Sequence, residues 1–157
     1  MTIMVRRAIV GDIDALVTFN AAMAQETEDL WLDHERLRAG VTHLLNHESD
    51  GFYFVAHEEH SEEVLGAVMV TFEWSDWRNG RFWWIQSVYI RPELRRQGIY
   101  SALHAHVRSL ASEDPDGCGI RLYVEHENRT AQKTYRTLGM TKTDYFMFEE
   151  DFGAEPR

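Results

Sequence analysis

The chain alternates between two kinds of segment that differ in the spacing of their apolar residues. Short runs rich in β-branched and aromatic residues are typical of strands, whereas longer stretches repeat apolar residues every three or four positions, as helices do. The strand-like segments are 4–10, 52–56, 64–72, 81–90, 119–124 and 145–149. Helices are expected to start after Asp12, after Asp33, at Ile99, and after Asn128 or Thr130. The order β-α-α-β-β-β-α-β-α-β predicts an α/β fold in which helices cover a mixed, mostly antiparallel sheet.

The turns between these segments predict how the strands pair. Short polar turns separate the strands between residues 52 and 90, and Asn79-Gly80 is a strong hairpin signal, so an antiparallel meander is expected. A helix separates 81–90 from 119–124, which makes that pair of strands parallel. The loop after 81–90 therefore lies at the carboxyl end of a parallel strand, where α/β sheets commonly bind ligands.

That loop has the residues of an anion site. Pro92 ends the strand, and Arg95 and Arg96 make the following turn basic. Gly98 then permits a close approach of the backbone to a ligand before the helix begins. Because the N–H groups of such a turn and of a helix N-terminus converge, they can hold a phosphate group. The alternative is that Gly98 only starts a helix and that the arginines form a solvated face.

Composition limits where the protein works and what it binds. A length of 157 residues with 44% hydrophobic and 27% charged residues fits one globular domain with a frayed tail at 153–157. A formal net charge of −10 argues against nucleic-acid binding and favours small cationic substrates, although Arg91, Arg95 and Arg96 can still bind a phosphorylated ligand. The chain has no apolar run of transmembrane length, no signal-peptide pattern and a single cysteine, Cys118. A cytoplasmic protein without membrane contact is therefore expected.

Other reactive side chains do not form a convincing site. His57 and His60, or His104 and His106, lack the further ligands that a zinc site needs, so no metal is expected. Cys118 lies between two glycines with no adjacent base, which argues against a nucleophilic role. The loop after 81–90 thus stays the main candidate site.

Trp74, Trp77, Trp83 and Trp84 gather around the expected hairpin. Together with Glu73 and Asp76 they can form a cage for a cationic amine. They can equally be core or dimer-interface residues, because strand alternation sends Trp83 and Trp84 to opposite faces. We favour packing or dimerisation for most of them, which makes a homodimer one expected form of the protein.

The loop resembles the acyl-CoA signature of the GNAT (GCN5-related N-acetyltransferase) superfamily, which is Arg/Gln-x-x-Gly-x-Gly/Ala between a strand and a helix. Residues 95–100, Arg-Arg-Gln-Gly-Ile-Tyr, match its first five positions and depart at Tyr100, where a small residue is usual. Residues 128–135, followed by Leu-Gly-Met at 138–140, are similar to the family's Asn-x-x-Ala-x-x-x-Tyr segment and its Leu-Gly-Phe ending.

The resemblance implies an acetyl-CoA-dependent N-acetyltransferase, an acyltransferase that moves an acetyl group directly to a primary amine of a small molecule or peptide within a ternary complex. It implies that Asn128 hydrogen-bonds the pantetheine arm of acetyl-CoA and that Tyr135 protonates the departing thiolate. The alternative for Tyr135 is a packed aromatic. The residues implied to bind acetyl-CoA are Val88, Tyr89, Ile90, Arg95, Arg96, Gln97, Gly98, Ile99, Tyr100, Ser101, Asn128, Ala131 and Tyr135.

The sequence offers no obvious base for the acceptor amine. Many relatives carry an acidic residue on the strand before the loop, whereas this chain has Gln86, which can orient a water but cannot accept a proton at neutral pH. Other candidates for the base or the acceptor pocket are Glu26, Glu73 and Glu125, with Trp84 as an acceptor contact, although such glutamates are more often surface carboxylates. The missing acid favours an alternative hypothesis, a noncatalytic acyl-CoA-binding or sensor protein of the same fold.

Overall fold

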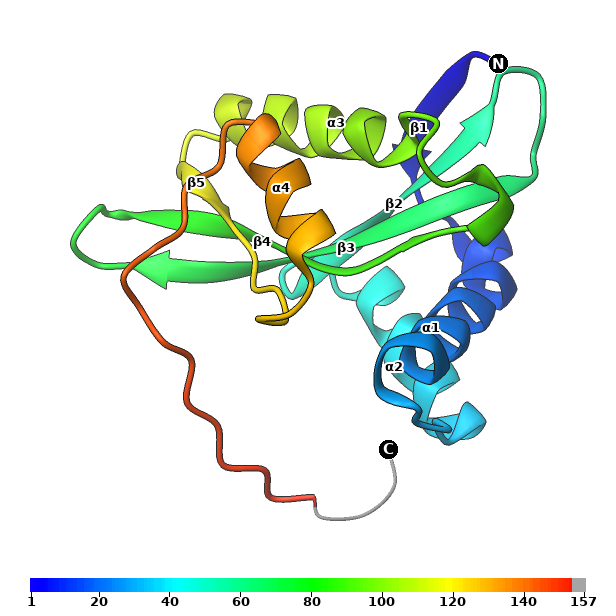
Figure 1. Cartoon of the computed structure of the whole chain (residues 1–157), viewed down its shortest axis with the longest axis horizontal. Coiled ribbons are helices and arrows are strands. Elements are labelled where there is room, and N and C mark those ends of the chain that lie inside the picture. The colour runs from blue at the N-terminus through cyan, green and yellow to red at the C-terminus, as the bar shows by residue number, and fades with distance from the viewer. Residues whose placement is uncertain (154–157) are drawn as a thin grey trace. The chain divides into compact units, whose positions relative to one another are not determined.

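The computed structural model describes residues 1–153, and the chain divides into two compact units, the first running from Met1 to Leu122 and the second starting at Tyr123 (Figure 1). The strands of the first unit are β1 (Ile3–Arg7), β2 (Gly51–Glu58), β3 (Val64–Ser75), β4 (Gly80–Ile90) and β5 (Gly117–Arg121). Its helices are α1 (Ile13–Glu28), α2 (His34–Asn46) and α3 (Ile99–Glu113), with short 3-10 turns η1 (Val10–Asp12) and η2 (Pro92–Leu94). The second unit contains α4 (Arg129–Thr137). Of the tail expected at 153–157, residues 154–157 lie outside the described part.

The strands form a five-stranded mixed sheet in the order β1-β2-β3-β4-β5. Neighbours from β1 to β4 are antiparallel, and β4 is parallel to β5, which confirms the expected meander and the crossover through α3. Asn79 adopts φ +48° in the turn before β4, the left-handed conformation that the Asn-Gly pair predicts. β5 occupies Gly117–Arg121 and not 119–124, because its pairing with β4 begins at Gly117.

Helices cover both faces of the sheet, with α1 and α2 on one side and α3 on the other (Figure 1). Because side chains alternate along β2, Tyr53 and Val55 pack with α1 and α2, whereas Phe54 and Ala56 pack with α3. Leu103, on the inner face of α3, is 0% exposed. Within the described residues, no helix combines the length and the apolar character needed to cross a membrane.

An irregularity in β4 lies within the stretch where the sheet opens. The register between β3 and β4 shifts so that Ser87 and Val88 lie opposite one residue of β3, and Ser87 adopts φ +49°. Parallel pairing with β5 ends at Trp84, while β4 continues to Ile90. We call residues 85–90 the open edge of β4, because β5 does not pair with them.

The prediction of a final strand at 145–149 is wrong, because these residues do not form a strand in the structure. Their apolar side chains are between 62% and 94% exposed; they are Tyr145, Phe146, Met147 and Phe148. Aromatic content raises strand propensity, but a strand forms only where it pairs with a neighbour. Consecutive apolar residues also lack the alternation that would turn one face of a strand inward.

Two expected helix caps have different outcomes. Asp33 caps α2, where its carboxylate accepts a hydrogen bond from the Arg36 N–H at 3.0 Å. Asp12 precedes α1 as expected, but its side chain does not cap that helix. Its carboxylate accepts instead from the Ile9 N–H at 2.8 Å and from the Arg6 guanidinium at 2.7 Å. Asp12 therefore fastens the end of β1 to the start of α1.

Candidate functional site

The loop between β4 and α3 has the backbone geometry of an anion site. Arg96 and Gly98 adopt φ +64° and φ +84°, and Gly98 directly precedes the first helical residue. The Ala102 N–H donates to the Gly98 carbonyl at 3.0 Å as the helix begins. The N–H groups of Gly98 and Ile99 come before this bond, so the helix itself does not use them. We call residues 95–98 and the first turn of α3 the anion loop.

The space beside Gly98 fits the approach of a ligand to the backbone. A Cβ atom built on Gly98 would meet no atom within 4 Å. Glycine is therefore favoured here by the left-handed conformation and not by crowding. Backbone donors, a helix N-terminus and open space are together what a pyrophosphate group requires.

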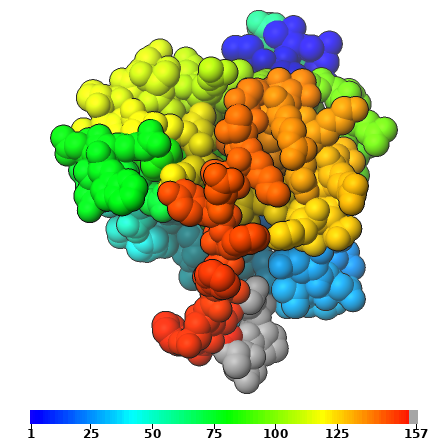
Figure 2. Space-filling view, turned by 60° about the vertical axis from the view of Figure 1, so that its left-hand side comes forward, coloured from blue at the N-terminus to red at the C-terminus, as the bar shows by residue number. Residues whose placement is uncertain are grey.

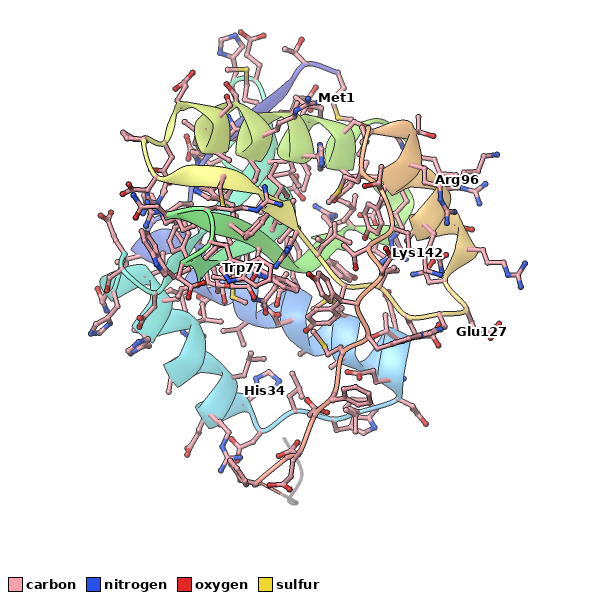
Figure 3. All side chains as sticks on the ribbon, turned by 90° about the vertical axis from the view of Figure 1, so that its left-hand side faces the viewer. Met1, His34, Trp77, Arg96, Glu127 and Lys142 are labelled. Carbon is pink, nitrogen blue, oxygen red and sulfur yellow. The ribbon has the colours of Figure 1, made fainter. Side chains whose placement is uncertain are left out.

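The expected basic patch is largely neutralised. Arg91 forms ion pairs with Glu63 and, at 2.7 Å, with Glu93. The hydrogen bond with Glu63, opposed by desolvation and aided by the charge of Glu93, raises the pKa of Arg91. Arg95 pairs with Glu26 at 2.9 Å. Arg96, labelled in Figure 3, is exposed and has no carboxylate within 4.0 Å among residues 1–153.

Tyr100 departs from the family signature without closing the anion loop. It is partly buried in the first turn of α3, and its ring centroid lies 6.0 Å from that of His104, one turn further along the helix. Burial, with a smaller effect of Arg108, lowers the pKa of His104, so this imidazole is neutral at physiological pH. Ser101, in the same turn, is exposed.

The open edge of β4 carries Gln86 in a defined orientation. The Gln86 side-chain N–H donates to the Thr71 hydroxyl across the β3–β4 pair. The carbonyl oxygen of the same amide is thereby left to accept a hydrogen bond. Val88 is partly buried, and the Tyr89 ring points inward and is 8% exposed. Thr71 was not recognised from the sequence, because it lies diagonally across from Gln86: Met69 is directly opposite Gln86, and Thr71 is opposite Trp84.

The second unit contains the other residues implied by the family resemblance. Asn128 caps α4, and its side-chain oxygen accepts from the Ala131 N–H at 3.1 Å, so one of the two expected caps is confirmed. The amide nitrogen of Asn128 is not used in that bond. Burial raises the pKa of the Tyr135 phenol. Gly139 adopts φ +93° just after α4, the left-handed conformation that commonly ends a helix.

The other expected carboxylates are engaged by their own surroundings. Glu73 accepts from Arg121 at 2.6 Å and from the Trp84 indole at 3.3 Å. Glu125 accepts from the Glu127 N–H at 2.6 Å in the turn before α4. Glu73 is therefore neutralised, and Glu125 stabilises a turn.

The tryptophans of the β3–β4 hairpin do not form one cage in the described part of the chain. Trp83 is 5% exposed, and its indole N–H donates to Asp114 at 2.9 Å. Trp74 and Trp77 are 58% and 93% exposed. Trp77, labelled in Figure 3, lies at the surface of the hairpin tip, which is green in Figure 2. Trp83 is thus a core residue, whereas Trp74 and Trp77 are free to contact other molecules.

Comparison with protein families explains why these features occur together. The model of the acetyltransferase (GNAT) family matches residues 16–140. The chain belongs to the GNAT family. This result confirms the resemblance drawn from the anion loop and from the segment around α4, and the mixed sheet with its covering helices is the fold of GNAT structures.

Individual GNAT relatives agree with this assignment. A thialysine N-epsilon-acetyltransferase of Bos taurus is 28% identical over 144 residues, which is 87% of this chain and 83% of the relative. The crystal structure of a possible acetyltransferase from Clostridium difficile 630 is 42% identical, with a TM-score of 0.87 over 96% of this chain and 98% of that one. A predicted acetyltransferase from Clostridium acetobutylicum, solved with acetyl-CoA, is 18% identical, with a TM-score of 0.76 over 95% of this chain and 96% of that one. The last likeness concerns the fold alone.

Proposed function

We propose that the protein is an acetyl-CoA-dependent N-acetyltransferase that moves an acetyl group directly to a primary amine of a small molecule or peptide. The observation that carries this proposal is the anion loop, where Gly98 at φ +84° places free backbone donors at the N-terminus of α3. Membership of the GNAT family supports the reaction type. The compact units are proposed to act as one GNAT domain, since the family match runs through both of them.

Acetyl-CoA, when bound, supplies an acetyl thioester ready for transfer. The donors proposed to hold its pyrophosphate are the backbone N–H groups from Arg96 to Ser101, with Arg96 as the nearby positive charge. The open edge of β4, at Val88, Tyr89 and Ile90, can pair with the amide-containing pantetheine arm as an added strand would. The Asn128 amide nitrogen is proposed as a further donor to that arm.

Gln86 and Tyr135 are proposed to assist the two proton transfers, removal of the amine proton and protonation of the thiolate. Gln86 cannot act as a base, but its amide is held by Thr71, so its free oxygen can orient a water that relays the amine proton to solvent. Tyr135 is proposed as the acid that protonates the thiolate leaving group. Its raised pKa supports this role, because the hydroxyl then keeps its proton at neutral pH.

The acceptor is proposed to be a small cationic amine. The net charge of −10 favours such a substrate over an anionic one. The bovine relative is named for acetylation of the ε-amine of thialysine, so thialysine and lysine are the first acceptors to test. Glu125 remains a proposed acceptor contact, and so does Trp84 beside the neutralised Glu73.

The second candidate function is a noncatalytic acyl-CoA sensor, favoured by Gln86 in place of a strand carboxylate. The test is a panel of amines incubated with acetyl-CoA, read by CoA release and by the intact mass of the product. An acetylated amine would support the enzyme. Binding of acetyl-CoA without turnover of any amine would support the sensor, and no binding at all would overturn both.

As the sequence suggests, the protein is proposed to be cytoplasmic and to form a homodimer. The exposed Trp74 and Trp77 support an interface, because tryptophan is enriched where proteins contact each other. Sedimentation equilibrium of the full chain would test the assembly. A mass equal to one chain at all concentrations would contradict it.

A further inference from the structure

A group of polar side chains joins the last turn of α1 to the anion loop. The Arg95 Nη2 atom donates to Glu26 Oε2 at 2.9 Å, and the Tyr89 hydroxyl lies 3.4 Å from Glu26 Oε1. The Arg95 Nε–H donates to the Ile90 carbonyl at 2.9 Å. The Arg95 guanidinium carbon also lies 5.4 Å from the centre of the Tyr89 ring. Glu26, Tyr89, Ile90 and Arg95 thus connect α1, the end of β4 and the loop.

The Tyr89 side of this group is fixed by the core. Tyr89 is 8% exposed, and its ring centroid lies 5.0 Å from that of Phe19 on α1. Burial and then the charge of Glu26 raise the pKa of Tyr89, so its hydroxyl remains a donor toward that carboxylate. A packed tyrosine therefore helps to hold Glu26 in place.

The two arginines of the loop differ in what their charges can do. Arg95 directs one guanidinium nitrogen to the Ile90 carbonyl and another to Glu26, and both partners lie outside the anion loop. Arg96 is exposed, and the part of the chain that the structure describes offers it no carboxylate partner. The charge of Arg95 is neutralised, whereas that of Arg96 is available.

We propose that Glu26 is a positioning residue for the binding of acetyl-CoA. Glu26 holds the Arg95 guanidinium between the end of β4 and α1, so that the anion loop keeps its shape. This inference rests on the proposed function. It gives Glu26 a role different from base or acceptor contact. It also makes a prediction opposite to simple electrostatics, since removing a carboxylate near a phosphate site would ordinarily strengthen anion binding.

Calorimetric titration of the full chain with acetyl-CoA tests the direction of the effect. Glu26→Gln is expected to weaken binding about two- to fivefold, the range for a partly exposed ion pair. Arg95→Lys keeps the charge but cannot direct two nitrogens in a fixed fork, so it is expected to weaken binding as well. Glu28→Gln on the same helix is the control and is expected to bind as the wild type does. Unchanged or tighter binding by Glu26→Gln would overturn the inference, and so would wild-type affinity in Arg95→Lys.

A second measurement examines the pair in the protein without ligand. Urea unfolding of wild type, Glu26→Gln, Arg95→Gln and the double variant forms a double-mutant cycle. The changes in the free energy of unfolding are expected to be non-additive. Strictly additive changes would overturn the proposed role of the Glu26–Arg95 pair even if acetyl-CoA binds. A wild-type protein that binds no acetyl-CoA would overturn the proposed function, and this inference with it. The cycle and the titration therefore distinguish the two failures.

Discussion

Arginine partners decide what Glu26 and Glu73 can do in this protein. Glu26 pairs with Arg95 and Glu73 pairs with Arg121. The sequence marked both glutamates as chemical candidates from residue type alone. It could not show their partners, because Glu26 and Arg95 are 69 positions apart and meet only when α1 packs against the sheet beside β4. Pairing over such distances depends on the fold, so residue type predicted the candidates and not their roles.

The Asp12 ion pair makes a prediction about stability. Burial alone would raise the pKa of Asp12, but hydrogen bonds from Arg6 and from the Ile9 N–H outweigh burial and lower it. A lowered pKa stabilises the folded state above the pKa of the unfolded chain, near 4, and this contribution is lost as the pH falls through the lower folded value. Asp12→Asn is expected to cost about 2 kcal/mol at pH 7, because Arg6 loses its charged partner. Urea unfolding at pH 7 and pH 3 should show the difference shrinking at pH 3. Asp76→Asn, at an exposed aspartate with no ion pair among the described residues, is the control, and a pH-independent cost would contradict the argument.

Tyr135 makes a prediction about catalysis. Tyr135→Phe removes the hydroxyl and keeps the ring, so turnover is expected to fall about 100-fold, with little change in acetyl-CoA affinity. Because the pKa of Tyr135 is raised, the acid form should persist through neutral pH and be lost only above the ordinary pKa of tyrosine. Initial rates and calorimetry separate the two quantities, with Tyr145→Phe as the control. Equal turnover in Tyr135→Phe would remove the acid role.

At the scale of elements, local patterns predicted most of the fold. Apolar spacing located α1, α2, α3 and α4, and the Asn79-Gly80 turn located the β3–β4 hairpin. The bulge at Ser87 was not predicted, since nothing in the sequence of β4 marks where an extra residue leaves the ladder. At 145–149 the error was the reverse. A strand was predicted from propensity, but these residues do not form one.

The anion loop makes the prediction that belongs to this scale. Gly98→Glu is expected to weaken acetyl-CoA binding more than tenfold, because it places a negative charge and a strained φ at the proposed pyrophosphate donors. Gly139→Glu is a matched control, since Gly139 also has a positive φ and open space where a Cβ would lie. Both variants should lose similar stability, and only Gly98→Glu should lose affinity in calorimetry. Equal affinities would place the pyrophosphate elsewhere.

For the whole molecule, ligand binding should appear as added stability. A ligand at 100 times its Kd stabilises the folded state by about 2.7 kcal/mol. In a protein of this size that corresponds to a rise in Tm of about 5–10 °C. Differential scanning fluorimetry with acetyl-CoA would measure the rise, and AMP, which has neither pyrophosphate nor pantetheine, is the control. An equal shift with both ligands would argue against the proposed site.

The open edge of β4 has a practical consequence for handling the protein. A strand edge that lacks a neighbour offers its backbone groups to any extended chain, including another copy of the same protein. Ligand-free preparations should therefore aggregate on storage more readily than preparations saturated with CoA. The gap in the sheet that is proposed to admit the pantetheine arm is also the place where self-association of the ligand-free protein is expected to begin.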